Sequence, residues 1–387
     1  MRSLLSLRNP LYVLAMVVGA IAGCGAIAFE FLSGLVSRFT LGEFAGYSPG
    51  GPRGEVDMFE ALGLEAGETG GGGPSWLWLV LLPAFGCWLS SLICRAFAPE
   101  AVGHGTDGAI EAYHKKGGRV RGRVPIVKAI ASALTIGCGG SGGREGPIAQ
   151  IGAGSGSWLA QRLGLSDRHC RLLLAAGMAG GVGAIFRAPF AGALFAAEIL
   201  YREAEFEGEV VMPSFLSSAV AYCTYCGFVR EFGTLFELGK GFEFTDPTEL
   251  LPYTALALAL VPMIALFTRF FYGSERLFAR VPLPKPIVAA IGGLLCGGTA
   301  VLAWQLTGDR LGLAVAGNGY GILQEALDGD VIGWSGVRLL LVVGLLKIVA
   351  TSCTIAGGGS GGVFGPSMVV GGTIGCAVGL IGQQLGL

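Results

Sequence analysis

Charged side chains are scarce in this chain. Asp, Glu, Lys and Arg together make up 14% of its 387 residues, whereas an ordinary soluble domain has about 25%. A water-soluble protein of this length needs more charge than that to cover its surface, so a soluble enzyme is excluded. The 26 basic and 27 acidic residues also leave a formal net charge of only -1. Without a basic field to attract it, nucleic acid is not expected as a partner.

Histidine is scarcer still, and so are the motifs of metal and nucleotide binding. The chain has three His, and its CxxC, formed by Cys223 and Cys226, is not followed by a second pair. A zinc site with the usual ligand spacing is therefore not expected. No GxxxxGK[ST] is present, and the GxGxxG at 137–142 lies between apolar segments rather than in a βαβ unit. We expect no metal and no organic cofactor.

Apolar residues and glycine are abundant instead. Hydrophobic residues make up 52% of the chain, and 68 residues are Gly. The first apolar run, Leu11 to Val36, contains Glu30 as its only charge and is long enough to cross a bilayer of about 30 Å, so we interpret it as a retained membrane helix. Several later runs are too short for a full span and are interrupted by glycine, which is typical of helices that end inside the membrane. The later runs cover 76–98, 124–138, 145–163, 172–200, 209–230, 252–271, 286–306, 336–356 and 363–385.

The charges of the connecting segments indicate an orientation. Loop 40–74 is acidic, with Arg53 as its only basic residue, whereas 114–123 and 269–285 are basic. The positive-inside rule then places the basic loops and the N-terminus in the cytoplasm, and we expect the plasma (inner) membrane as the location. A further basic stretch, 162–171, breaks a simple alternation of sides. Half-helices allow this because they do not cross the membrane.

The strongest signal is an internal repeat. The string GGSGGREGP at 139–147 recurs as GGSGGVFGP at 358–366, an offset of 219 residues. Duplicated halves with broken helices are the architecture of membrane transporters, in which the substrate site lies between the halves. We therefore divide the chain into a first membrane repeat, 1–205, with a long extracytoplasmic loop, and a second membrane repeat, 206–387.

The second repeat is expected to be truncated at its C-terminus. The string QRLGL at 161–165 is echoed by QQLGL at 383–387. In the first repeat further motifs follow within 166–200, but the second repeat stops at Leu387, before their counterparts. No regulatory domain is expected within the chain.

Each copy of the repeated string leads into an apolar helix. Pro147 and Pro366 stand near the helix starts, where proline is tolerated because its missing N–H would have no partner. A helix N-terminus presents free N–H groups and about half a positive charge, so two such ends that meet inside a membrane can bind an anion. We expect the Glu145 carboxylate to occupy the anion position and to leave it on protonation, as a pH-sensitive gate. Its neighbour Arg144 either pairs with an acidic residue or draws anions inward, and the sequence leaves both open.

Three strings resemble the CLC family of chloride channels and proton/chloride exchangers: GREGP at 143–147, GVFGP at 362–366 and FRAPFAGALFAAE at 186–198. The resemblance extends over about 100–387. It implies an all-α polytopic membrane protein, an inverted-repeat bundle whose discontinuous helices meet at a midplane anion site. It also implies a homodimer in which each subunit has its own anion pathway, with membrane lipid and small anions as the other partners and the chloride ion as substrate.

The resemblance further implies which residues line the pathway. Glu145 is implied as the gate, and Lys128 matches a lysine that the family keeps near the pathway. GHGTD at 103–107 stands where the family usually has GSGIP, so His104 takes the place of an anion-coordinating serine and the preference among chloride, nitrate and other small anions is open. A neutral His donates one N–H, and a protonated one adds charge. The implied anion-binding residues are His104, Gly105, Arg144, Glu145, Gly146, Val363 and Phe364, of which Arg144, Gly146, Val363 and Phe364 act through backbone amides.

The positions for a proton relay depart from the family pattern. Proton-coupled members commonly carry a second glutamate directly after the one that matches Glu198, and here that residue is Ile199. An aliphatic residue there is typical of the channel branch. Glu198 and Glu203 stay as candidates for a proton relay. The tyrosine that the family uses in the pathway falls beyond Leu387.

These patterns predict transport of chloride or similar small anions across a membrane, gated by Glu145 and channel-like or weakly proton-coupled. One alternative is a proton/chloride antiporter. A second alternative, of a different class, is a polytopic membrane enzyme acting on lipid headgroups, with Glu145 as base and the helix ends as a phosphate cradle. Such an enzyme needs a second catalytic group and a metal site. Neither is visible in the sequence, so we expect a transport protein rather than an enzyme.

Overall fold

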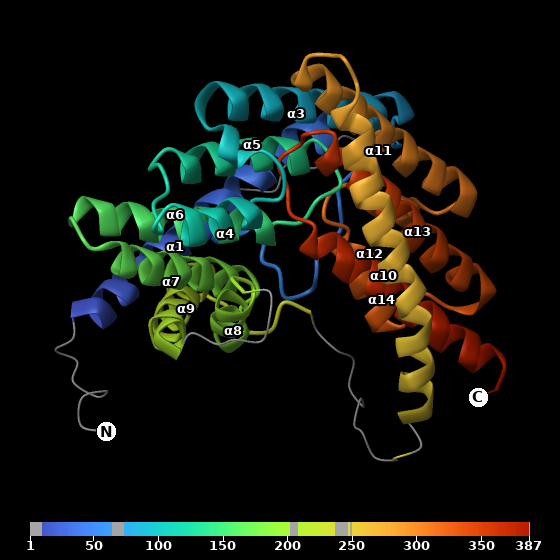
Figure 1. Cartoon of the computed structure of the whole chain (residues 1–387). Coiled ribbons are helices and arrows are strands. Elements are labelled where there is room, and N and C mark those ends of the chain that lie inside the picture. Colours follow the sequence, from blue (N-terminus) through green and yellow to red (C-terminus); the bar gives the residue numbers. More distant parts are fainter. Residues whose placement is uncertain (1–9, 64–72, 202–207, 237–246, 248–249, 387) are drawn as a thin grey trace.

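The computed structural model describes residues 10–63, 73–201, 208–236, 247 and 250–386. Within those residues the chain is helical, and its extended segments make only isolated backbone bridges. Seven of the described helices are long and apolar enough to cross a membrane. The prediction of an all-α polytopic membrane protein is therefore confirmed. Figure 1 shows most of the N-terminal half, blue to green, on one side of the molecule and the C-terminal half, yellow to red, on the other, with the helix Trp76–Phe97 lying across the top.

Helices α1 to α9 lie between residues 10 and 229. The first apolar run forms α1 and continues into a π-helical turn at Arg38–Phe44. Helix α9 packs against α1, α7 and α8, and the division of the chain at 205/206 stays a prediction. The helices are α1 (Pro10–Ser37), α2 (Met58–Ala61), α3 (Trp76–Phe97), α4 (Thr106–Lys115), α5 (Val124–Gly137), α6 (Glu145–Arg162), α7 (Asp167–Ile185), α8 (Pro189–Glu198) and α9 (Gly208–Val229).

Helices α10 to α14 come from the second half. Helix α11 packs against α3 from the first half as well as against α13, so the two halves share an extended contact. Short 3₁₀ turns at Pro99–Ala101 and Arg310–Val315 precede α4 and α12 respectively. The helices are α10 (Leu250–Ala279), α11 (Lys285–Thr307), α12 (Tyr320–Asp328), α13 (Gly333–Ala356) and α14 (Phe364–Gln384).

The apolar run predicted at 172–200 is two helices rather than one. Helix α7 ends at Ile185 and α8 begins at Pro189. Arg187 between them adopts φ 52°, a left-handed conformation that is uncommon outside glycine. Proline clashes with a helical residue before it and cannot continue the hydrogen-bond ladder, so the helix has to restart there.

The two copies of the repeated string exchange hydrogen bonds with each other. Gly143 N–H donates to Gly362 O at 2.7 Å, and Gly362 N–H donates to Gly143 O at 2.8 Å. Further bonds come in matched pairs: Gly142 N–H to Gly317 O and Gly361 N–H to Gly103 O; Ser141 N–H to Thr354 Oγ1 and Ser360 N–H to Thr135 Oγ1; Ser141 Oγ with Thr351 Oγ1 and Ser360 Oγ with Ser132 Oγ. Contacts in which i meets j and j meets i define a two-fold relation. The repeats are therefore arranged about a local two-fold axis.

This exchange brings two helix N-termini together inside the molecule. Each string leads directly into a helix, so α6 and α14 both begin at the contact between the copies. From there α6 extends into the N-terminal half and α14 into the C-terminal half (Figure 1). The prediction of discontinuous helices whose starts meet between inverted repeats is confirmed.

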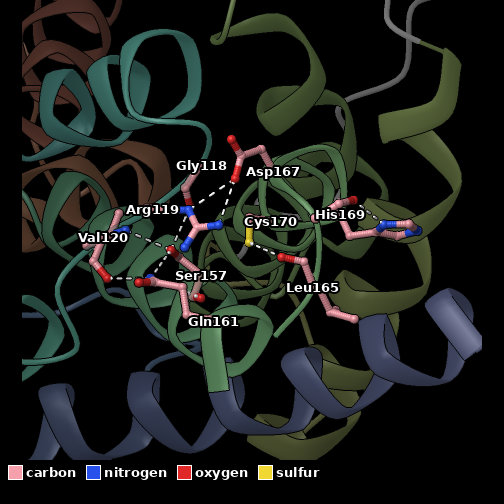
Figure 2. Close-up of polar contacts among 10 residues, drawn as sticks. Gly118, Arg119, Val120, Ser157, Gln161, Leu165, Asp167, His169 and Cys170 are labelled. Carbon is pink, nitrogen blue, oxygen red and sulfur yellow. Dashed lines mark hydrogen bonds and ion pairs between the residues drawn. The ribbon is translucent and has the colours of Figure 1, made fainter. Parts of the chain in front are cut away.

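The basic loop between α4 and α5 lies against the ends of α6 and α7 (Figure 2). Arg119 Nε and Nη2 donate to Asp167 Oδ1 at 3.1 and 2.8 Å. The Ser157 hydroxyl donates to Gly118 O at 2.6 Å. The two basic stretches, before α5 and before α7, are thus at the same end of the molecule. A helix that starts inside the protein reaches that end without a full crossing, which explains the broken alternation of charge.

Candidate anion site

Glu145 is the first residue of α6, and its carboxylate reaches across to the other half of the molecule. Gly365 N–H at the start of α14 donates to Glu145 Oε2 at 3.1 Å. The hydroxyl of Tyr320, the first residue of α12, donates to Glu145 Oε1. Only 3% of Glu145 is exposed. The carboxylate therefore lies where the N-termini of α6 and α14 meet, a position that the helix ends make favourable for an anion.

Two glycines of the repeated string make room for this carboxylate. A Cβ added at Gly365 would lie 2.9 Å from Glu145 Oε2 and 2.8 Å from the Tyr320 hydroxyl. A Cβ added at Gly143 would overlap Glu145 Oε2. Glycine is needed at both positions because the carboxylate approaches the backbone more closely than a side chain permits.

Free backbone donors surround the same point. Arg144 and Gly146 flank Glu145 at the start of α6, and Val363 and Phe364 open α14. In the part of the chain that the structure describes, none of these four N–H groups has a hydrogen-bond acceptor. The first turn of any helix leaves its N–H groups without intrahelical partners, so these donors are available to a ligand. Their assignment as anion ligands stays a prediction.

The side chain of Arg144 pairs with acidic residues, which decides between the two alternatives that the sequence left open. Its Nη1 lies 2.6 Å from Glu30 Oε1 and 2.5 Å from Glu55 Oε1. The Tyr225 hydroxyl donates to the other oxygen of Glu30. The guanidinium carbon lies 5.7 Å from the centre of the Tyr320 ring. Arg144 is 4% exposed, so its charge neutralises the lone acidic residue of the first apolar run.

His104 stands at one end of the site with both ring nitrogens engaged. Its Nδ1 lies 2.8 Å from Thr106 Oγ1 and its Nε2 lies 3.0 Å from Asp107 Oδ2. The hydrogen bond from His104 holds the pKa of Asp107 below its ordinary value. In this conformation a neutral imidazole uses its single N–H on Asp107 and has none left for an anion. The role of His104 in selectivity stays a prediction.

Two cavities lie on opposite flanks of the site. One, of about 410 Å³, is lined by His104, Gly105 and Lys285 among others. The other, of about 200 Å³, is lined by Arg144 with its two carboxylate partners and by Gly317. One cavity thus borders the first GxG loop and the other borders its counterpart in the second repeat. A pathway through the midplane requires a cavity on each flank of the site.

Lys128 holds the loop before α4, and a second lysine holds the loop before α12. Lys128 Nζ donates to Ala101 O at 3.1 Å and to Gly103 O at 2.6 Å. Lys347 Nζ lies 2.8 to 3.5 Å from the four carbonyl oxygens of 314–317. Both lysines are fully buried. Lys128 therefore spends its donors on backbone carbonyls of the loop that carries His104, and its role in the pathway stays a prediction.

The candidates for a proton relay are not gathered at the site. Glu198, the last residue of α8, is exposed, whereas Ile199 packs at the edge of a buried apolar cluster that includes Leu200. Glu203 lies outside the described residues. A relay through either glutamate stays a prediction.

Three residues of this arrangement were not predicted from the sequence: Tyr320, Lys347 and Glu55. Lys347 follows Lys128 by the same 219 residues as the repeated string, and that offset was an available signal. Tyr320 ends a GNGY that parallels GHGT at 103–106, which was a weaker one. Glu55 gave no signal, because it is one of several acidic residues in its loop.

Two inverted halves whose broken helices end at a buried point lined with hydrogen-bond donors define a membrane transport protein of the broken-helix class. The profile of the family described as "Voltage gated chloride channel" matches residues 86–387. The chain therefore belongs to the voltage-gated chloride channel (CLC) family, a family of anion transport proteins, and the resemblance drawn from the three strings is confirmed.

Two curated relatives are each 30% identical to this chain and match 79% of it. A ClcB-like chloride channel protein of Ralstonia nicotianae aligns over 311 residues, 68% of its own length. The H⁺/Cl⁻ exchange transporter ClcA of Cronobacter sakazakii aligns over 314 residues, 63% of its own length. The chain thus spans about two thirds of the length of these relatives.

Solved structures show the same fold. A slow cyanobacterial Cl⁻/H⁺ antiporter superposes with a TM-score of 0.73 at 20% identity, covering 98% of this chain and 81% of that one. A CLC-type fluoride/proton antiporter gives a TM-score of 0.72 at 22% identity, covering 97% of this chain and 82% of that one.

Proposed function

We propose that this protein moves chloride or a similar small anion across the membrane through the point where the N-termini of α6 and α14 meet, and that Glu145 is the gate. The observation that carries the proposal is the position of the Glu145 carboxylate. It accepts the Gly365 N–H at 3.1 Å, so a side-chain anion already occupies the place that the helix ends favour. A permeating anion competes with the carboxylate for that place.

The gate opens when the carboxylate loses its charge or swings away. Once Glu145 is protonated, the attraction of the helix ends for its side chain falls and the backbone donors become free for another anion. The amides of Arg144, Gly146, Val363 and Phe364 then take part in holding it. Small anions suit such a site because backbone N–H groups stabilise negative charge without a full cation in the membrane interior.

We infer channel-like or weakly proton-coupled conduction. Ile199 cannot carry a proton, and Glu198 is exposed on the outside of α8. The competing mode is proton/chloride antiport. The Cronobacter relative is named as an H⁺/Cl⁻ exchange transporter. The measured coupling between chloride and proton flux separates the two modes.

The assembly and orientation belong to the same proposal. We infer a homodimer in which each subunit has its own pathway, as the family resemblance implies. We also infer that the N-terminus and the end of the molecule with the two basic stretches face the cytoplasm, which the positive-inside rule supports, and that the membrane is the plasma (inner) membrane.

The test is anion flux from the purified full-length protein in liposomes. Glu145→Gln and Glu145→Ala remove the competing charge, so both are expected to abolish the pH dependence of flux while anion permeation persists. The matched control is Glu111→Gln, which changes a half-exposed carboxylate paired with Lys116 on α4 and leaves the pH profile unaltered. Flux whose pH dependence survives in both Glu145 variants would contradict the gate assignment.

A further inference from the structure

Tyr320 occupies a position at the gate that no motif assigned. It is the first residue of α12 and follows Gly319, whose φ of 80° turns the chain sharply into the helix. The side chain is fully buried, and its hydroxyl donates to Glu145 Oε1. Its ring meets the Phe236 ring edge-on with centroids 5.4 Å apart. The buried hydroxyl of Tyr320 thus points at a carboxylate oxygen of Glu145, which occupies the proposed anion position.

The hydroxyl is held in place independently of Glu145. Lys347 fixes the carbonyl oxygens of 314–317, just before the turn into α12. Gly365 leaves the room that the hydroxyl needs, because a Cβ there would lie 2.8 Å from the phenol oxygen. Neither restraint involves the carboxylate. The donor therefore keeps its position when the gate moves away.

A buried O–H donor that loses its acceptor is costly. Leaving such a group unsatisfied costs its full desolvation free energy, so the departure of the carboxylate demands a replacement. The Gly365 N–H is left in the same situation, since it also donates to Glu145. A small anion in the position of the carboxylate satisfies both donors at once.

We propose that the Tyr320 hydroxyl is a ligand of the transported anion, for which the Glu145 carboxylate substitutes while the gate is closed. The ligand class is a small monovalent inorganic anion with concentrated charge, such as a halide. Charge-assisted O–H bonds are short and about twice as strong as neutral ones, and they favour anions with dense charge over large diffuse ones. Tyr320, a residue of the second half of the chain, therefore sets the affinity and the selectivity of the site for anions. The inference rests on the proposed function.

The first experiment removes the gate and then the donor. In the Glu145→Ala protein, Tyr320→Phe is expected to weaken chloride binding about tenfold, the effect of one charge-assisted hydrogen bond. Thiocyanate binding is expected to weaken much less, because the charge of this anion is diffuse. The ratio of chloride affinity to thiocyanate affinity therefore changes, which a merely structural tyrosine does not produce. Binding is measured by titration calorimetry in detergent, and flux in liposomes.

Tyr113→Phe is the matched control. Tyr113 is a buried tyrosine on α4 whose hydroxyl lies 3.2 Å from the Tyr201 hydroxyl, away from the gate. Its change is expected to leave chloride and thiocyanate affinities within about twofold, because surface and core positions away from a ligand act only on stability.

The second experiment needs no change at Tyr320. Bromide bound to the Glu145→Ala protein is located by its anomalous scattering in crystals, and we expect it within hydrogen-bond distance of the Tyr320 hydroxyl and of the Gly365 N–H. Bromide found elsewhere, or equal chloride affinity with and without the hydroxyl, overturns the inference. If the protein with Glu145→Ala neither binds nor conducts any halide, the proposed function itself fails, so the two failures are distinguishable.

Discussion

Three buried cations around the site bind partners from other parts of the chain. Arg144 binds the carboxylates of Glu30 and Glu55, and Lys128 and Lys347 each bind backbone carbonyls. Removing an ion from water costs several kcal/mol unless new partners replace the hydration. Such residues therefore tolerate little change, whereas His104 is partly exposed to a cavity, and its role in selectivity stays a prediction.

His104→Ser is expected to shift the preference between chloride and nitrate by about two- to tenfold, the effect of one neutral hydrogen bond. The reason is that serine offers a free O–H, whereas the imidazole N–H is taken by Asp107. Reversal potentials under mixed anion gradients measure the preference. If the variant and the parent protein have the same preference at every pH, His104 is structural.

The pH dependence of this effect has a defined origin. The pKa of Asp107 is lowered by the hydrogen bond from His104, so Asp107 stays ionised from pH 5 to 8. The stabilisation from this hydrogen bond is lost only as the pH falls below the ordinary pKa of an aspartate. A positive charge on the imidazole attracts anions, so we expect a part of the rise in chloride affinity toward acid pH to depend on His104 and to be lost in His104→Ser, while the part that comes from protonation of Glu145 persists. His169→Ser, at an exposed histidine that contacts Ser166, is the control and keeps the parent profile.

At the scale of elements, the loops that lead into α4 and α12 are built alike. Gly105 with φ 91° and Gly319 with φ 80° end the two loops, and a buried lysine from the following long helix holds each one. The loops present one residue each to the anion region: His104 in the first and Tyr320 in the second. Their likeness follows from the two-fold relation of the halves, which places equivalent backbone on both sides of one point.

Lys347→Met is expected to lower the free energy of unfolding by about 2–4 kcal/mol, because it leaves a row of buried carbonyls without a donor while its apolar stem is preserved. Lys128→Met, which frees two carbonyls rather than four, is expected to cost less. Thermal unfolding in detergent compares the variants. Lys116→Met, at a half-exposed lysine, is the control and stays within about 0.5 kcal/mol of the parent. Equal stability of all three variants would show that neither lysine supports its loop.

At the scale of the whole molecule, the two halves meet through α3 against α11 and also through backbone and hydroxyl groups around the anion position. Gly143 and Gly362 exchange hydrogen bonds there, and apolar clusters pack on either side. In the proposed function, this contact is where a small anion passes Glu145. At the end of α8, Glu198 is exposed and Ile199 is apolar.

We therefore predict that a chloride gradient does not drive protons uphill through this protein. An unassisted charge is costly in a membrane interior, and the position expected to relay the proton is Ile199. The measurement is the pH change inside liposomes under an imposed chloride gradient, with Glu145→Gln as the control for movement through the gate. Sustained proton pumping that Glu145→Gln blocks would establish a relay and the antiport mode.

Much of the architecture could be predicted from local sequence alone. Low charge and long apolar runs require a membrane, since such a surface cannot be hydrated. The duplicated string predicts two like halves, and its glycines and prolines predict helices that start at that string. These features depend on composition and on neighbours within a few residues, so they are legible without the fold. Helices α4 and α12 were not predicted, because they are short and α4 is polar.

Only the tertiary structure decided which side chains share the site. Arg144 could have faced anions or acids, and the fold brings Glu30 and Glu55 to it from positions 114 and 89 residues away. Tyr320 reaches Glu145 across 175 residues. Sequence periodicity describes the face of one helix at a time, whereas these contacts join helix ends and loops from different halves. These contacts form because the two-fold packing of the repeats brings two loops and two helix N-termini together at one place.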